Sequence, residues 1–193
     1  MVSSGGPVWD ESTRPVGPPA PAGQAYTEHA VGRHLVDVHD HLRAELARLQ
    51  DLLRQVTAGT LPAGEARGAL NRMTMRQHHW ALGAYCAAYC AALTQHHTLE
   101  DRAVFPHLRT VDAGLAPVVD RLEQEHEVIH GVLEALDRAL VAYLEAGDPA
   151  SLDAAMELLA GALLSHLAYE ERELVEPLSR YGFYPGQIPA GSF

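Results

Sequence analysis

The chain has 193 residues and a net charge of −11; twelve residues are His, and all fourteen basic residues are Arg. Nucleic-acid binding and polybasic membrane attachment both depend on clustered positive charge, so this acidic composition argues against both classes of partner. The two cysteines cannot form a disulfide framework and the N-terminus lacks the pattern of a secretory signal, so we expect a cytoplasmic protein.

The first 24 residues are rich in Pro and Gly and have little hydrophobic periodicity, which predicts a disordered, solvated tail over 1–24. Apolar residues then recur at steps of three and four until Gly59, which predicts a long amphipathic helix. Its apolar stripe consists of Leu35, Val38, Leu42, Leu46, Leu49, Leu53 and Val56. We expect one domain over residues 25–181, followed by a C-terminal tail over 182–193.

A Gly- and Pro-rich break over 59–64 ends the first helix, and a short helix is expected around 65–71. A second long helix starts near Met75. It should bend or end near Pro106, because proline lacks an amide donor and its ring clashes with the preceding turn.

The third long helix is predicted to begin near Pro117 and the fourth near Pro149, since proline suits the first helical position. The fourth helix should end at about Arg180. No segment shows the alternation typical of a strand. The prediction is an all-α fold, an antiparallel (up-down-up-down) four-helix bundle with an extra short helix between the first and second long helices.

Helical geometry sorts the histidines by the face that they occupy, because residues three, four or seven apart share a face. Each long helix directs at least one His into the core, and two helices follow it with a carboxylate about one turn later. A single inward His is usually a hydrogen-bonded core residue, but burying this many unpaired polar groups would cost on the order of several kcal/mol. The inward histidines are His39, His96, His126, His130 and His166.

Neutral imidazoles and carboxylates are ligands for a divalent or trivalent metal. The set exceeds the four ligands that a tetrahedral zinc takes, and imidazoles with bridging carboxylates suit a pair of iron ions. The site is therefore expected to be binuclear.

Four motifs, in the order HDHLR, HHTLEDRAVFP, EQEHEVIH and SHLAYEERELVEP, resemble the hemerythrin-like, or HHE cation-binding, family of the bacterial type. The resemblance covers about residues 28–180 and implies a cofactor of two non-haem Fe ions with an oxo or hydroxo bridge. It implies that one iron is held by three imidazoles, the second by two, and that two carboxylates bridge them. These ligands are, in turn, His126, His130 and His166; His39 and His96; and Glu100 and Glu171. In the second motif, His97 and Asp101, each one residue further along the chain, are the alternatives to His96 and Glu100.

Helical geometry favours Glu170 over Glu171, because Glu171 lies five residues after His166, or about 140° around an ideal helix. The motifs favour Glu171, because the second helix reads His-x3-Glu-x5-Pro and the fourth reads His-x4-Glu-x5-Pro. A single-residue π-bulge between His166 and Glu171 would return Glu171 to the inner face. The two glutamates stay open as alternatives.

The resemblance implies binding or reduction of a small oxidant, O2, H2O2 or NO, at the iron with fewer imidazoles, which keeps an open position. Tyr85 and Tyr89 share the helix face of His96, so they are either packing aromatics or catalytic phenols that donate a hydrogen bond or proton to the oxidant. A catalase- or peroxidase-like enzyme is one interpretation. A non-catalytic iron or oxygen sensor, or an iron-storage bundle, is the alternative, and either a monomer or a homodimer fits the sequence.

Overall fold

The computed structural model describes residues 10–21, 30–58, 68–146 and 149–183, with the backbone alone over 68–82. All regular structure in these ranges is helical, so the all-α prediction is confirmed. The four long helices are α1 (Val31–Thr57), α2 (Gly68–Leu99), α4 (Ala116–Ala146) and α5 (Ala150–Tyr181).

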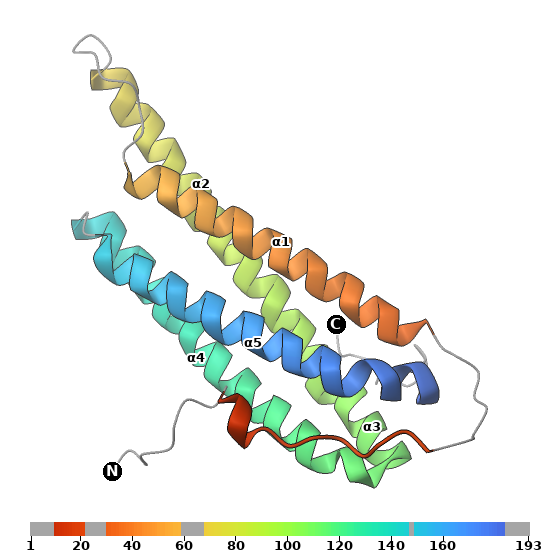
Figure 1. Ribbon diagram of the computed structural model, residues 1–193. Helices are drawn as coiled ribbons and strands as arrows, with labels where there is room; N and C mark the ends of the chain where they lie inside the picture. The colour runs from red at the N-terminus through yellow and green to blue at the C-terminus, as the bar shows by residue number, and fades with distance from the viewer. Residues whose placement is uncertain (1–9, 22–29, 59–67, 147–148, 184–193) are drawn as a thin grey trace.

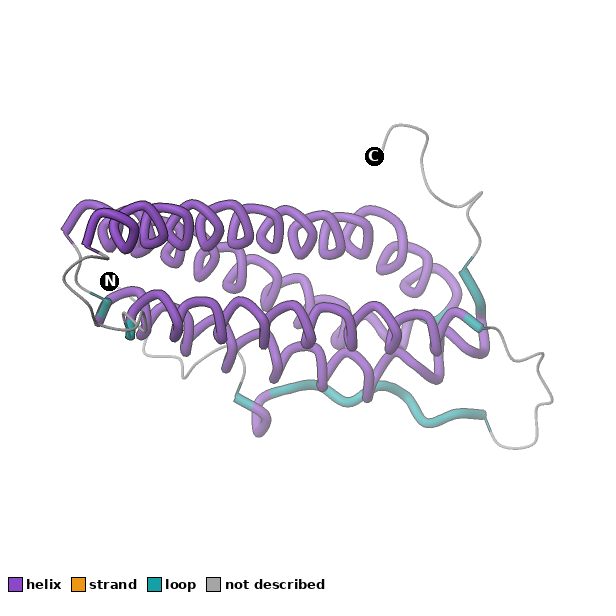
Figure 2. Tube along the Cα trace, turned by 90° about the horizontal axis from the view of Figure 1, so that it is seen from above, coloured by secondary structure: helices purple, strands orange, loops and turns teal. Residues whose placement is uncertain are grey.

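The long helices pack in a closed ring of contacts, in which α1 and α4 each lie against both α2 and α5 (Figures 1 and 2). The N-terminal turn of α1 lies so close to α5 that a Cβ atom on Gly32 would collide with the carbonyl of Val175. The short helix expected around 65–71 is not a separate element in the described part of the chain. Residues 68–71 belong to α2, and residues 65–67 lie outside the described ranges.

A π-helical turn, η3 (Glu100–Val104), follows α2 and leads into α3 (Phe105–Val111). The amide of Phe105 bonds to the carbonyl of Glu100, five residues back. Pro106 explains the wider turn, since it has no amide to donate and its ring crowds the preceding carbonyls. The expectation of a π-bulge in the fourth long helix was wrong, because α5 is α-helical throughout.

Two apolar clusters form the core, and a polar layer lies between them on α1, α4 and α5 and at the C-terminal end of α2. On α1, Leu35 belongs to one cluster and Leu42 to the other, with the fully buried His39 between them. The same order recurs on α4 around His126. The apolar packing on both sides therefore fixes the height at which the polar side chains meet.

Residues 10–21 pack along the bundle, beginning with the 3₁₀ turn η1 (Glu11–Thr13) (Figure 2). The tail was expected to be solvated over 1–24, yet Arg14 is only 7% exposed, and the hydroxyl of Tyr169 donates to the carbonyl of Pro15 at 2.8 Å. Hydrophobic periodicity does not predict this docking, because polar and ring contacts hold the segment. Residues 1–9 and 22–24 of the expected tail lie outside the described ranges.

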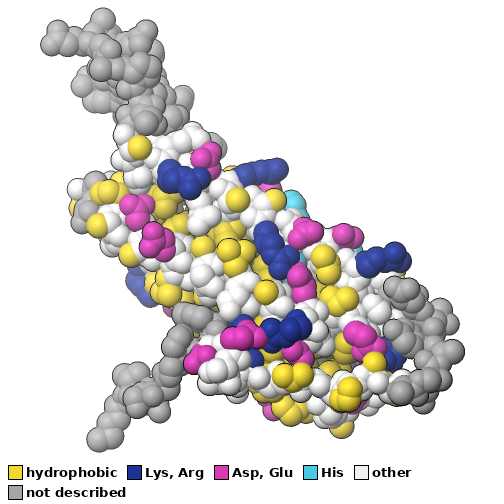
Figure 3. Space-filling view, in the orientation of Figure 1, with side chains coloured by type: hydrophobic (Ala, Val, Ile, Leu, Met, Phe, Trp, Pro, Cys, Tyr) yellow, Lys and Arg dark blue, Asp and Glu magenta, His cyan; other side chains and the backbone are white. Residues whose placement is uncertain are grey.

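Arg and acidic side chains are interspersed with apolar ones on the face shown in Figure 3. Among the described residues, none of the helices is both long and apolar enough to cross a membrane.

Candidate metal centre

The polar layer brings together seven side chains from α1, α2, η3, α4 and α5. They form two groups, and within each group the potential ligand atoms lie within 4.8 Å of one another. We call the first the three-His group (His97, His126 and His166). We call the second the two-His group (His39, His96, Glu100 and Glu170).

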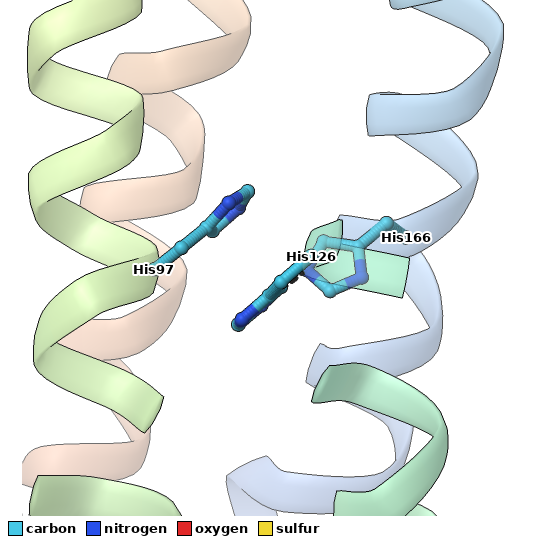
Figure 4. A group of neighbouring side chains, drawn as sticks. All are labelled: His97, His126 and His166. Atoms are coloured by element: carbon cyan, nitrogen blue, oxygen red, sulfur yellow. Dashed lines mark hydrogen bonds between the residues drawn. The ribbon is translucent and has the colours of Figure 1, made fainter. Parts of the chain in front are cut away.

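The three imidazoles of the three-His group point toward one another from α2, α4 and α5 (Figure 4). The rings of His97 and His126 stack with centroids 3.9 Å apart. The Nε2 atoms of His126 and His166 are 3.2 Å apart. All three side chains are buried.

The two glutamates of the two-His group lie between its imidazoles and those of the three-His group. Glu100 places Oε1 3.2 Å from Nε2 of His96 and Oε2 3.7 Å from Nε2 of His126. Oε2 of Glu170 is 3.5 Å from Nε2 of both His39 and His166. Each carboxylate thus faces one imidazole from either group, which is the placement that a bridging ligand requires.

Carboxylates on the outer side of three rings set the direction of the imidazoles. Glu171 lies 2.9 Å from Nδ1 of His39, Asp101 lies 2.8 Å from Nδ1 of His126, and Glu125 lies 3.1 Å from Nδ1 of His166. An ionised carboxylate only accepts hydrogen bonds, so each Nδ1 donates and each Nε2 keeps its lone pair for the interior.

This proton arrangement makes a cation fit the site. When each ring carries its one proton on Nδ1, His126 and His166 present two lone pairs to each other across 3.2 Å. Neither ring can donate to the other, whereas a cation between them accepts both lone pairs. Carboxylate-oriented imidazoles of this kind are typical of metal ligands.

The same conclusion follows from buried polar atoms without hydrogen bonds. Among the described residues, the carboxylate oxygens of Glu100 and Glu170, when both groups are ionised, and Nε2 of His97 are buried with no hydrogen-bond partner. Such atoms are costly to bury unless something else satisfies them. Metal coordination would satisfy all five.

Burial also sets the protonation of these side chains. It lowers the pKa of His96 to about 3, with help from neighbouring imidazoles, and it holds the pKa of His97 and His166 well below the ordinary value. Burial raises the pKa of Glu100 and Glu170. The imidazoles of His96, His97 and His166 are therefore in the neutral form that binds metal, and a cation would favour the ionised form of the carboxylates.

Five of the expected ligands, His39, His96, Glu100, His126 and His166, meet in this layer. His130 does not join them: its side chain is 62% exposed and its Nε2 faces Glu134 on the surface, 3.5 Å away. The inner stripe of α4 continues from His126 through Ile129 and Leu133, which leaves His130 beside it.

His97 occupies the third place in the three-His group, where His130 was expected. Two consecutive residues both reach the core because α2 lies between α1 and α4. His96 faces His39 of α1, and His97 stacks on His126 of α4. The sequence signal was the His96–His97 doublet, but a single stripe along the helix selects only one of the two residues.

Glu170 faces one imidazole of each group and Glu171 does not, as expected for a regular helix after His166. Glu171 is 22% exposed, accepts from Nδ1 of His39 and pairs with Arg43 at 2.7 Å. It therefore supports an imidazole from outside.

The hydroxyls of the two candidate tyrosines bond to α1. Tyr89 is buried and donates to the carbonyl of Leu42 at 3.3 Å, and its burial raises its pKa. Tyr85 donates to Glu45. Both contacts are those of packing aromatics that satisfy their polar ends.

Two recesses reach the metal layer from different sides. A mainly apolar cleft of about 510 Å³ ends at His96 and Glu100, and a smaller recess of about 280 Å³ ends at His97 and His126. The apolar walls of the cleft come from Val31, Leu35, Val38, Leu99, Val104, Leu178 and Phe183.

In a comparison with known families, the model of the hemerythrin HHE cation binding domain matches residues 30–178. No curated protein and no solved structure matches the chain. The matched range contains all seven residues of the two groups and begins after Arg14.

Proposed function

The chain belongs to the hemerythrin HHE cation-binding family, and from this premise we propose that it holds two iron ions and binds or reduces a small oxidant, O2, H2O2 or NO. The observation that carries the proposal is the placement of the Glu100 and Glu170 carboxylates between two sets of buried imidazoles.

Each side chain has a distinct part in the proposal. The three-His group would hold one ion and His39 with His96 the other, while Glu100 and Glu170 would bridge them. Imidazoles with bridging carboxylates favour iron over a four-coordinate zinc. Asp101, Glu125 and Glu171 would hold the rings by their outer nitrogens.

A pair of Fe(II) ions can supply two electrons, which together with two protons is what reduction of H2O2 to two water molecules requires. The two-His group offers fewer protein nitrogens, and the apolar cleft ends beside it. Apolar walls exclude bulk water and admit small uncharged molecules more readily than ions. The oxidant would therefore enter beside His96.

Proton donation by Tyr89 or Tyr85 is a further part of the proposal. Either hydroxyl would have to turn away from its present acceptor, the Leu42 carbonyl or Glu45. If Tyr89→Phe leaves the rate of H2O2 loss unchanged, the phenol of Tyr89 has no part in the chemistry.

The test is to load the chain with Fe(II) without oxygen and to record visible spectra after adding O2 and H2O2 separately. A reversible band with O2 supports a carrier, and sustained loss of H2O2 supports an enzyme. Bound iron that responds to neither oxidant would contradict the proposal and favour iron storage. The surface variant His130→Ala is the matched control and should behave as the wild type. The cytoplasmic location and the monomeric or homodimeric state stay predictions.

A further inference from the structure

Arg14 connects the N-terminal segment 10–17 to the metal layer. Its side chain is 1% exposed and binds Glu125 with two parallel bonds, from Nε to Oε1 and from Nη2 to Oε2, each 2.9 Å. Nη1 donates to Ser165 Oγ at 3.0 Å and to Glu11 at 2.9 Å. This bidentate geometry fixes the plane of the Glu125 carboxylate as well as its position.

Glu125 is in turn the carboxylate that holds His166. The same Oε2 atom accepts from Nη2 of Arg14 and from Nδ1 of His166, the latter at 3.1 Å. His166 is fully buried and contributes Nε2 to the three-His group. A chain of two hydrogen bonds therefore runs from a residue outside the matched domain to a candidate ligand.

The segment that carries Arg14 is anchored on both sides of it. Tyr169 donates its hydroxyl to the Pro15 carbonyl at 2.8 Å, and the guanidinium of Arg14 lies over the Tyr169 ring, 4.6 Å from its centroid. The amide of Gly17 donates to Glu173 at 2.8 Å. These contacts hold Arg14 in register with α4 and α5.

We propose that Arg14 is a positioning residue of the metal centre, which holds Glu125 so that His166 keeps Nε2 directed at the ion. The inference rests on the proposed metal binding and adds the N-terminal segment to the centre. Removing Arg14 frees the carboxylate of Glu125 to turn, and His166 loses its fixed orientation. Metal should then leave the three-His group faster.

A purely structural role, in which Arg14 only ties the segment to the bundle, predicts a different result. Arg172 also ties down the segment, since it pairs with Glu11 and Glu173 and lies over Tyr169. No contact between Arg172 and Glu125 is found among the described residues. Arg172→Gln is therefore the matched control for Arg14→Gln.

The experiment uses the full chain loaded with Co(II) and measures the rate of Co(II) loss to a chelator together with the visible Co(II) absorption. Changing the partner of a metal-bound imidazole typically weakens metal binding about 10- to 100-fold, which is the effect expected of Glu125→Gln. Arg14 acts one hydrogen bond further from His166, so Arg14→Gln should lose Co(II) faster by about 10-fold, the lower end of that range, and should alter the spectrum. Arg14→Lys should lose Co(II) at a rate between those of the wild type and Arg14→Gln, because a single ammonium group cannot make both parallel hydrogen bonds of the guanidinium. Arg172→Gln should match the wild type in both measurements.

A double-mutant cycle with Glu125→Gln tests the route through Glu125. If Arg14 acts through Glu125, adding Arg14→Gln to Glu125→Gln changes the Co(II) loss rate little. Additive effects, or equal rates for Arg14→Gln and Arg172→Gln, would overturn the inference. If circular dichroism shows that Arg14→Gln does not fold, the same double-mutant cycle is measured with Arg14→Lys in its place, combined with Glu125→Gln.

Failure of this inference is distinguishable from failure of the proposed function. A wild-type chain that retains neither Co(II) nor Fe(II) removes the proposed function itself. If the wild type retains metal and Arg14→Gln retains it equally well, only the proposed role of Arg14 is contradicted.

Discussion

The two halves of the candidate metal centre are built differently. The three-His group has three imidazoles, and one of them is braced by the buried pair of Glu125 and Arg14. The two-His group has two imidazoles, and the larger, apolar cleft ends beside it. The comparison suggests a division of work, in which one half retains its ion and the other meets the oxidant.

Removing Glu100 should have the largest effect, because its two oxygens face one imidazole of each half. Glu100→Ala should lose both ions, since the remaining imidazoles would have to hold two cations with Glu170 as the one remaining bridge. Metal per chain, measured by elemental analysis after removal of free metal, checks this. Glu134→Ala, the same change on the surface of α4, should keep the wild-type content, and a Glu100→Ala chain that also keeps it would contradict the bridging role.

Removing one imidazole from one half or from the other should show that the two halves differ in how well they retain metal. His126→Ala should lower the metal content and the melting temperature together, because metal bound only to the folded state stabilises it by about 3 kcal/mol at 100 times its Kd. His39→Ala should lose one ion and leave the ion of the three-His group in place. Elemental analysis and thermal unfolding of the loaded chains measure both. Equal losses in the two variants would show that the halves do not differ in retention.

His97 and His130 test which residue completes the three-His group. His97→Ala should weaken metal binding strongly, because His97 is buried against His126 and its Nε2 has no hydrogen-bond partner among the described residues. His130→Ala should change neither metal affinity nor melting temperature, because the side chain is 62% exposed. A competition titration with a chelator gives both affinities. The reverse ranking would restore His130 as the ligand.

Narrowing the cleft should have the smallest effect of these changes, and it should act only on the half that contains the two-His group. Val31→Phe places a larger side chain at the wall of the cleft, away from the ligands, and should slow the reaction with H2O2 several-fold without changing metal content. Stopped-flow absorption of the iron-loaded chain measures the rate. Val141→Phe, at a site 48% exposed on α4, is the matched control. An unchanged rate in Val31→Phe would argue against entry by this route.

The sequence predicted the helices and five of the seven grouped residues, because both depend on the period of a single helix. Leu35, His39 and Leu42 show this, as they lie on one stripe whatever surrounds it. His97 could not be chosen over His130 in this way, because its position depends on where α2 sits between two other helices. Arg14 was missed for a related reason: a bidentate contact with Glu125, 111 residues away, leaves no periodic signal.

The π-turn shows a further limit of pattern comparison. The motifs suggested an extra residue between His166 and Glu171, whereas the wider turn lies over Glu100–Val104, before Pro106. Glu170 then reaches the centre from a regular helix, at the i,i+4 spacing from His166. Local geometry predicted this residue better than the spacing of motifs.

The number of iron ions per chain tests the central claim most directly. The full chain is loaded with Fe(II) without oxygen, free metal is removed, and iron and protein are quantified in the same sample. Two sets of imidazoles joined by two carboxylates predict about two irons per chain. A count near one would contradict a binuclear iron centre.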